Sequence, residues 1–181
     1  MKGIVFREFL DLVETKFGLN TVNEIIEKSE LKSKGAYTSI GTYEFSEMLS
    51  LITNLSEKTK ITIDDLLHTY GLHFFSVLEQ NYPKIVSKYN NPIALLSSID
   101  SHIHVQVRKI YPEAELPKFE VLDQTEKSIT LIYTSSRSMY AFALGLIEKT
   151  FHHYKSNAKV TYHKLKEDGS KVKFVILENE Q

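Results

Sequence analysis

The hydrophobic pattern of this chain changes character at Pro112. Before this residue, apolar side chains recur at the three- and four-residue spacing of amphipathic helices. After it, short segments rich in β-branched and aromatic residues alternate with polar turns, around one further helix. We expect strands over 119–122, 129–133, 159–165 and 171–177, with a helix over 139–154 between the second and the third. This order predicts an α+β fold, with a helical N-terminal lobe and a C-terminal lobe of helices and a four-stranded antiparallel sheet.

The helices before Pro112 have recognisable ends. Gly18 is a stop signal for the first helix, and Thr62 followed by Asp65 resembles a capping box for the fourth. Pro83 ends that fourth helix, and Pro92 suits the first turn of the next. The predicted helices run through 4–17, 22–26, 45–55, 63–78 and 92–110, with a loop over 32–43.

The helix predicted over 92–110 carries His104. At 100° per residue its apolar stripe consists of Leu96, Ile99, Ile103 and Ile110. His104 lies off this stripe, beside Ser97, Ser101, Arg108 and Tyr111. Small serines beside a histidine leave room for a bulky planar group, but they are also typical of a solvated helix face.

Composition excludes several classes of function. The 181 residues fit one domain, and 22 basic against 23 acidic residues do not predict a nucleic-acid surface. The chain has no cysteine, so disulfides, thiolate zinc sites and iron–sulfur clusters are excluded, and His and carboxylates remain as metal ligands. We see no signal peptide and no apolar run that would span a membrane, and we expect a cytoplasmic protein.

Two motifs carry candidate chemistry. The first is His104-x6-Tyr111-Pro112, and the second is Tyr133-x-Ser135-x-Arg137, whose alternate spacing places three donors on one face of extended backbone. A neutral imidazole is an axial ligand for haem iron, and a guanidinium with two hydroxyls suits a pair of carboxylates. His102 competes with His104 as the ligand, and the alternative for the second motif is that Ser135 or Ser136 caps the following helix.

Together these motifs resemble the H-NOX family, the haem domains that bind nitric oxide or oxygen. Gly71, Pro117 and the segments Met1-Lys2-Gly3 and Gly145-Leu146-Ile147 extend the resemblance along the whole chain. The resemblance implies a haem b between a distal lobe (1–60) and a proximal lobe (61–181) of a single domain (1–181). It also implies that His104 is the proximal iron ligand, that Pro117 presses on the haem, and that Tyr133, Ser135 and Arg137 hold the propionates.

The resemblance also implies which gases bind. Family members that hold oxygen carry a tyrosine five residues after the motif arginine, and this chain has Phe142 there. Tyr140 lies on another helical face and does not replace it. The matched pocket positions are all apolar: Val5, Phe9, Leu78, Phe142 and Leu146. We therefore expect nitric oxide and carbon monoxide to bind ferrous haem, and oxygen to be excluded.

As for output, we expect a sensor rather than an enzyme. By resemblance, its partner is a histidine kinase or a cyclic-di-GMP enzyme, and binding of nitric oxide weakens the iron–His104 bond and moves the His104 helix. Two rival readings are a haem enzyme, such as a peroxidase or a nitric-oxide-consuming oxygenase, and a haem-free interaction module. A surface metal site at His152, His153 and His163 is less favoured than exposed polar residues.

Overall fold

We analysed a computed structural model of the chain, in which residues 1–179 are described. The chain forms two compact units, Met1–Tyr70 and Gly71–Gln181. The predicted α+β class with a four-stranded antiparallel sheet is confirmed. The division into lobes 1–60 and 61–181 stays a prediction. No helix within residues 1–179 has both the length and the apolar composition that crossing a bilayer requires.

The first unit consists of α1 (Gly3–Phe17), α2 (Leu19–Lys28), α3 (Phe45–Thr59) and the start of α4 (Ile63–Asn81). Gly18 separates α1 from α2 with a φ of 83°, a backbone conformation that glycine adopts at little cost. One half of the predicted capping box is present, because the Asp65 N–H donates to the Thr62 hydroxyl (3.1 Å), while that hydroxyl donates to the Asp65 carboxylate (2.6 Å). Phe6, Phe9, Ile25, Met48, Leu51 and Ile52 form its core.

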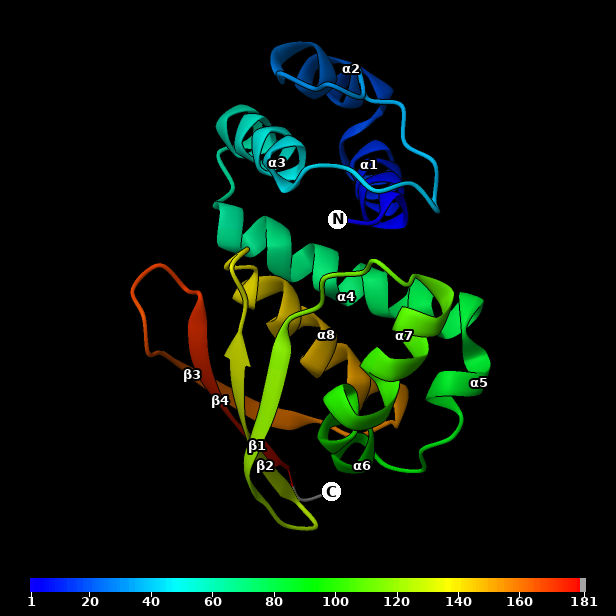
Figure 1. The fold of residues 1–181 in the computed structure, drawn as a ribbon. Helices are drawn as coiled ribbons and strands as arrows, with labels where there is room; N and C mark the ends of the chain where they lie inside the picture. The colour runs from blue at the N-terminus through cyan, green and yellow to red at the C-terminus, as the bar shows by residue number, and fades with distance from the viewer. Residues whose placement is uncertain (180–181) are drawn as a thin grey trace. The chain divides into compact units, whose positions relative to one another are not determined.

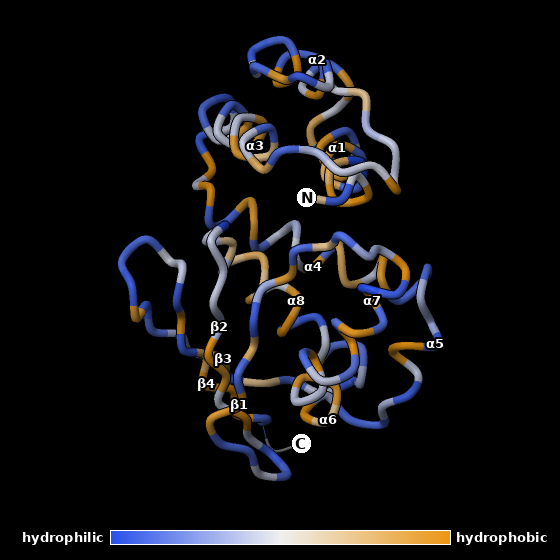
Figure 2. The backbone as a smooth tube through the Cα atoms, in the orientation of Figure 1, coloured by the Kyte–Doolittle hydropathy of each residue, from blue (hydrophilic) through white to orange (hydrophobic). Residues whose placement is uncertain are grey.

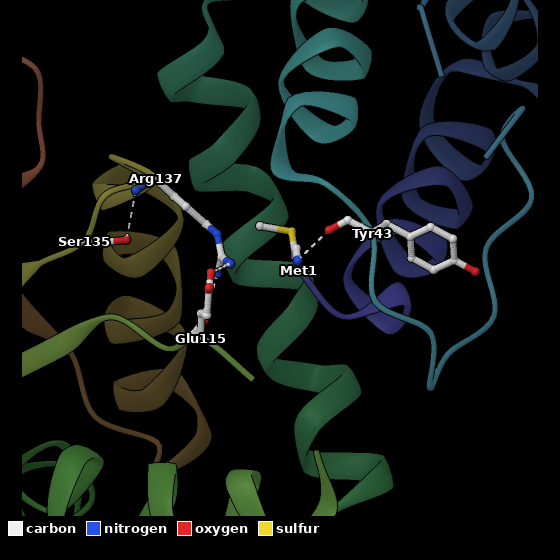
Figure 3. Close-up of polar contacts among 5 residues, drawn as sticks. All are labelled: Met1, Tyr43, Glu115, Ser135 and Arg137. Atoms are coloured by element: carbon white, nitrogen blue, oxygen red, sulfur yellow. Dashed lines mark hydrogen bonds and ion pairs between the residues drawn. The ribbon is translucent and has the colours of Figure 1, made fainter. Parts of the chain in front are cut away.

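Polar contacts hold the N-terminus and the loop between α2 and α3 in this unit. The α-amino group of Met1 donates to the Tyr43 carbonyl oxygen (2.6 Å), as Figure 3 shows. The Glu47 carboxylate, buried on α3, accepts hydrogen bonds from the Ser33 hydroxyl (2.5 Å) and the Tyr37 hydroxyl (2.7 Å). The loop predicted over 32–43 is thereby held against α3.

The second unit is built on a sheet in the order β1-β2-β4-β3, with every neighbouring pair antiparallel (Figure 1). Its strands are β1 (Lys118–Gln124), β2 (Ser128–Thr134), β3 (Ala158–Lys164) and β4 (Lys171–Glu178). One face of the sheet is buried against helices that include α8 (Tyr140–His153). Figure 2 shows hydrophobic stretches in the strands and in α8. The inward residues of the two central strands are Ile129, Leu131, Tyr133, Val172, Phe174 and Ile176.

Two predictions about helices in this unit are wrong. The single helix over 92–110 is interrupted: α6 (Pro92–Ser97) is followed by a π-helical turn, η1 (Ile99–Ile103), and then by α7 (His104–Ile110). A π-turn is a local widening of the helix, so a projection at 100° per residue fails beyond it. Ile110, predicted on the apolar stripe, is 46% exposed. A short helix, α5 (Pro83–Val86), lies where no helix was predicted.

Candidate functional site

The π-turn determines the surroundings of His104, the first residue of α7. His104 is the buried residue of that helix, with 9% of its surface exposed. Its Nδ1 atom lies 2.9 Å from Oδ1 of Asp100, which belongs to the π-turn. The second carboxylate oxygen, Oδ2, accepts the backbone N–H of Phe119 (3.0 Å), at the start of β1. Asp100 therefore joins the imidazole to the sheet.

This contact defines the chemistry of the ring. A carboxylate only accepts, so Nδ1 carries the hydrogen and Nε2 carries the lone pair of the neutral imidazole. Within residues 1–179, Nε2 has no hydrogen-bond partner. Burial lowers the pKa of His104, and the Asp100 charge opposes this without reversing it. The ring is thus a neutral, oriented nitrogen donor, which is the form that binds metals.

His102, the competing ligand, has both ring nitrogens engaged. Its Nε2 lies 3.2 Å from the Lys88 ammonium group, and its Nδ1 lies 2.5 Å from the Tyr89 hydroxyl. An ammonium group only donates, so Nε2 accepts and Nδ1 carries the hydrogen toward Tyr89. His102 has no lone pair left for a metal.

The Tyr-Ser-Arg motif spans the end of β2 and the turn before α8. Tyr133 is 2% exposed, and burial raises the pKa of its phenol, opposed by the Ser135 hydroxyl. The Ser135 hydroxyl accepts the backbone N–H of Arg137 (3.2 Å). The expected alternative, that Ser135 or Ser136 caps the next helix, is wrong: the N-cap of α8 is Met139, and no side chain caps it.

Arg137 binds a carboxylate within this unit. Its Nη2 lies 2.5 Å from Oε2 of Glu115, and its Nη1 donates to the Glu115 carbonyl oxygen (2.8 Å) (Figure 3). The Arg137 side chain is 15% exposed and the Glu115 side chain 82% exposed. The guanidinium is therefore fixed while its carboxylate partner lies at the surface, so the geometry of carboxylate recognition is in place.

An aromatic row connects the two motifs. The rings of His104 and Phe119 are 6.1 Å apart, and those of Phe119 and Tyr133 are 5.5 Å apart. Phe119 and Tyr133 are also register partners on β1 and β2. Pro117 is half-buried just before β1. The structure thus brings His104, Pro117 and the Tyr-Ser-Arg motif into one region of the second unit.

Three predicted pocket residues lie on α4 and α8 in this unit. Phe142 packs on Phe74, with ring centroids 5.6 Å apart, and Leu78 and Leu146 are half-buried. A Cβ atom at Gly71 would lie 2.1 Å from the Phe142 carbonyl oxygen, so α4 and α8 are in close contact there. Tyr140 packs instead on Tyr162, with ring centroids 5.4 Å apart.

The other two predicted pocket residues belong to the first unit. Phe9 is 1% exposed and packs edge-on against Tyr70, whose hydroxyl donates to the Val5 carbonyl oxygen (2.6 Å). Beside Phe9, the first unit contains a mostly apolar pocket of about 180 Å³, lined by residues that include Leu12, Leu55 and Leu66.

The histidines near the end of the chain have other surroundings. His153 pairs with Glu79 (3.0 Å from Nδ1 to Oε1), and His163 is exposed on β3. Nowhere in residues 1–179 do three or more His, Asp or Glu side chains form a group able to hold a metal ion.

Sequence reasoning missed two partners of the site. Asp100 precedes His104 by four residues, a spacing at which helical side chains meet, so this acid was available as a signal. Glu115 lies in a loop 22 residues before Arg137, and no sequence pattern links the two.

Comparison with known proteins gives consistent results. The sequence model described as Haem-NO-binding matches residues 2–162. A solved H-NOX protein from K. algicida, Fe(II) unliganded, is 60% identical, with a TM-score of 0.98 over 100% of this chain and 98% of that one. An H-NOX protein from S. oneidensis in the Fe(II)NO state is 26% identical (TM-score 0.92, covering 99% and 100%). The IWP-051-bound H-NOX from Shewanella woodyi in the Fe(II)CO state is 35% identical (TM-score 0.83, covering 99% and 95%). A search of curated proteins finds no match.

Proposed function

This chain belongs to the haem-nitric-oxide-binding (H-NOX) family of haem-based gas sensors, and on that premise we propose that it senses nitric oxide through a ferrous haem b bound by His104. The observation that carries the proposal is the state of the His104 ring. Its Nδ1 is fixed by Asp100, and its Nε2 is left with a free lone pair on a neutral, largely buried ring. A proximal haem ligand requires that arrangement.

The remaining donors fit the periphery of a haem. Haem propionates are carboxylates, and Arg137 already binds a carboxylate through one side of its guanidinium. We propose that the propionates contact Arg137, with Tyr133 and Ser135 beside it, and that Pro117 contacts the haem face. Val5 and Phe9 belong to the first unit, and their predicted role in lining the gas pocket stays a prediction based on the family resemblance.

Selectivity among gases follows from Phe142. When bound, ferrous haem supplies a site for nitric oxide and carbon monoxide, and nitric oxide weakens the bond from iron to His104. Bound oxygen needs a hydrogen-bond donor, and the proposed pocket residues Leu78, Phe142 and Leu146 offer none. We propose that the protein excludes oxygen for this reason. Relatives solved in Fe(II)NO and Fe(II)CO states support these gases as ligands.

The signal, in this proposal, is the movement of α7. Once His104 is released, α7 leaves the position in which Asp100 ties it to β1. A helix with two positions is a switch that a ligand biases by its different affinity for each. We propose that the moving surface regulates a histidine kinase or a cyclic-di-GMP enzyme in the cytoplasm, and that the domain itself catalyses no reaction.

The proposal is tested by His104→Gly. We expect this variant to lose the haem absorption band of the wild type, and free imidazole added to the culture and buffers to restore it. His102→Gly is the matched control, and it should keep a normal band because both nitrogens of His102 are already engaged. A His104→Gly protein that binds haem like the wild type without imidazole would disprove the proximal role.

A further inference from the structure

A short segment of the second unit contacts both ends of the His104 helix. We define this clasp segment as residues 82–89, which comprise α5 and its flanking turns, close to α7 in Figure 1. Backbone hydrogen bonds from Ile85 to Tyr82 (2.9 Å), from Ser87 to Pro83 (2.8 Å) and from Tyr89 to Val86 (3.2 Å) brace it. The segment is compact enough to act as a single piece.

Its C-terminal end contacts the π-turn. The Tyr89 hydroxyl and the Lys88 ammonium group hold the two nitrogens of His102, at 2.5 and 3.2 Å. Since His102 is two residues before His104, this contact anchors the start of the His104 helix. Lys88 is exposed, whereas Tyr89 and His102 are half-buried, so the tyrosine bond is the better shielded of the two.

Its N-terminal end contacts the far end of α7. The Tyr82 hydroxyl lies 2.8 Å from the hydroxyl of Tyr111, the residue that ends α7. Burial, followed by the contact with Tyr111, raises the pKa of Tyr82 to about 12. The Tyr82 phenol is therefore neutral near pH 7, and this second contact is a hydrogen bond between two hydroxyl groups.

The clasp segment is itself attached to α8. The hydroxyl of Tyr154, the residue that ends α8, donates to the Tyr89 carbonyl oxygen (3.0 Å) and lies 3.4 Å from the Val86 carbonyl oxygen. Val86 is buried, so this attachment joins the segment to the core of the unit. The His104 helix is thus tied, through one small piece, to a helix on which the sheet packs.

We propose that the clasp segment positions the His104 helix and sets how readily that helix moves when iron releases His104. This inference rests on the proposed function, and it assigns Tyr82 and Tyr89 as positioning residues. The two contacts are about 13 Å apart along the helix. A displacement of the whole helix must therefore break both, whereas fraying at one end breaks only one.

The size of the effect follows from the chemistry of the contacts. Each of the two tyrosines contributes one hydroxyl hydrogen bond, so removing that hydroxyl should shift the equilibrium for helix displacement by about two- to tenfold. Because both bonds oppose the same movement, loss of both should shift it by more than either alone. Asp100 ties His104 to β1, whereas the clasp segment ties the helix to α8, so the two restraints connect the helix to different elements.

The experiment compares Tyr82→Phe, Tyr89→Phe and the double variant with Tyr162→Phe. Tyr162 is the matched control, since its hydroxyl makes no hydrogen bond within residues 1–179. Two quantities are measured on haem-loaded protein. One is hydrogen exchange of the amides of 99–111 without gas, and the other is the rate and final extent of His104 release after nitric oxide is added, read from the absorption spectrum.

We expect both single variants to exchange about two- to tenfold faster and to release His104 faster or more completely, the double variant most of all. Tyr162→Phe should match the wild type. Unchanged exchange in the double variant overturns the clasp, as does faster exchange with unchanged His104 release. A wild type that takes up no haem overturns the proposed function itself, which the spectrum reveals before any variant is compared.

Discussion

The two nitrogens of the His104 ring differ in function because a single carboxylate contacts only one of them. Asp100 accepts from Nδ1 through one oxygen and from the Phe119 backbone through the other. A carboxylate shared in this way raises the donor strength of the opposite nitrogen and fixes the plane of the ring. The quality of the proposed iron ligand thus depends on a residue that does not touch the metal.

Asp100→Asn tests this dependence. An amide has one acceptor oxygen, so it can satisfy either His104 or Phe119 but not both, and its NH2 group then faces a second donor. We expect the free energy of unfolding, measured with urea, to fall by about 1–2 kcal/mol. The iron–histidine stretching frequency of the ferrous protein should also fall. Asp123→Asn, on an exposed carboxylate of β1, should change neither quantity.

Phe142→Tyr tests the basis of gas selection. The added hydroxyl supplies a donor at the position where oxygen-binding family members carry one. We expect the ferrous variant to give a stable oxygen-bound spectrum in air, whereas the wild type should not. Phe142→Leu changes the same side chain without adding a donor, and this control should resemble the wild type in air. Identical spectra of Phe142→Tyr and wild type in air would remove the selectivity argument.

Individual residues of the site were easier to predict than their partners. The spacing of His104 from Tyr111 and the alternation of Tyr133, Ser135 and Arg137 are properties of the sequence itself. The contact of Arg137 with Glu115 depends on how a loop returns to the sheet, which local spacing does not encode. The engagement of His102 by Tyr89 is likewise a tertiary contact.

At the scale of elements, regular helices and strands were predicted and irregular ones were not. The limits of α1, α8 and the four strands follow from periodicity, glycine stops and turn residues. The π-turn of 99–103 has no propensity signature, because it is one extra residue inside an otherwise helical pattern. The proposed cap by Ser135 or Ser136 fails because the turn continues through Ser138, at a positive φ (52°), and the N-cap of α8 is Met139.

Gly71→Ala tests the close crossing of α4 and α8. The new methyl group would lie 2.1 Å from a backbone oxygen of Phe142, so the helices must separate. We expect the free energy of unfolding to fall by about 1–3 kcal/mol, the usual cost of overfilling a packed contact. Gln80→Ala, at an exposed position of the same helix, should have little effect. Equal stability of Gly71→Ala and wild type would show that the helices part at no cost.

At the scale of the molecule, His104 couples stability to pH. Its pKa is lowered in the folded protein from the ordinary value of 6.5, so the unfolded chain takes up a proton first as the pH falls. The contribution of His104 to the free energy of unfolding is therefore complete above about pH 6.5 and is lost as the pH falls below it. Coordination of Nε2 to iron would act in the same direction. Lys58 and Lys32 lower the pKa values of Glu24 and Glu44, so these carboxylates affect the free energy of unfolding only below about pH 4.5.

We expect urea midpoints of the wild type to fall more steeply between pH 7 and pH 5 than those of His104→Gln. The glutamine keeps a polar side chain of similar size but does not titrate. His163→Gln, at an exposed histidine, is the control and should follow the wild type. Parallel pH profiles for the wild type and His104→Gln would mean that His104 does not titrate differently on unfolding.

The engagement of His102 has one more consequence. His102 and His104 are separated by a single residue, so an incoming metal could in principle bind either imidazole. The lone pair of His102 accepts a hydrogen bond from Lys88, whereas Nε2 of His104 has no hydrogen-bond partner within residues 1–179. Misligation is thereby disfavoured by the protein's own hydrogen bonds, before any cofactor arrives.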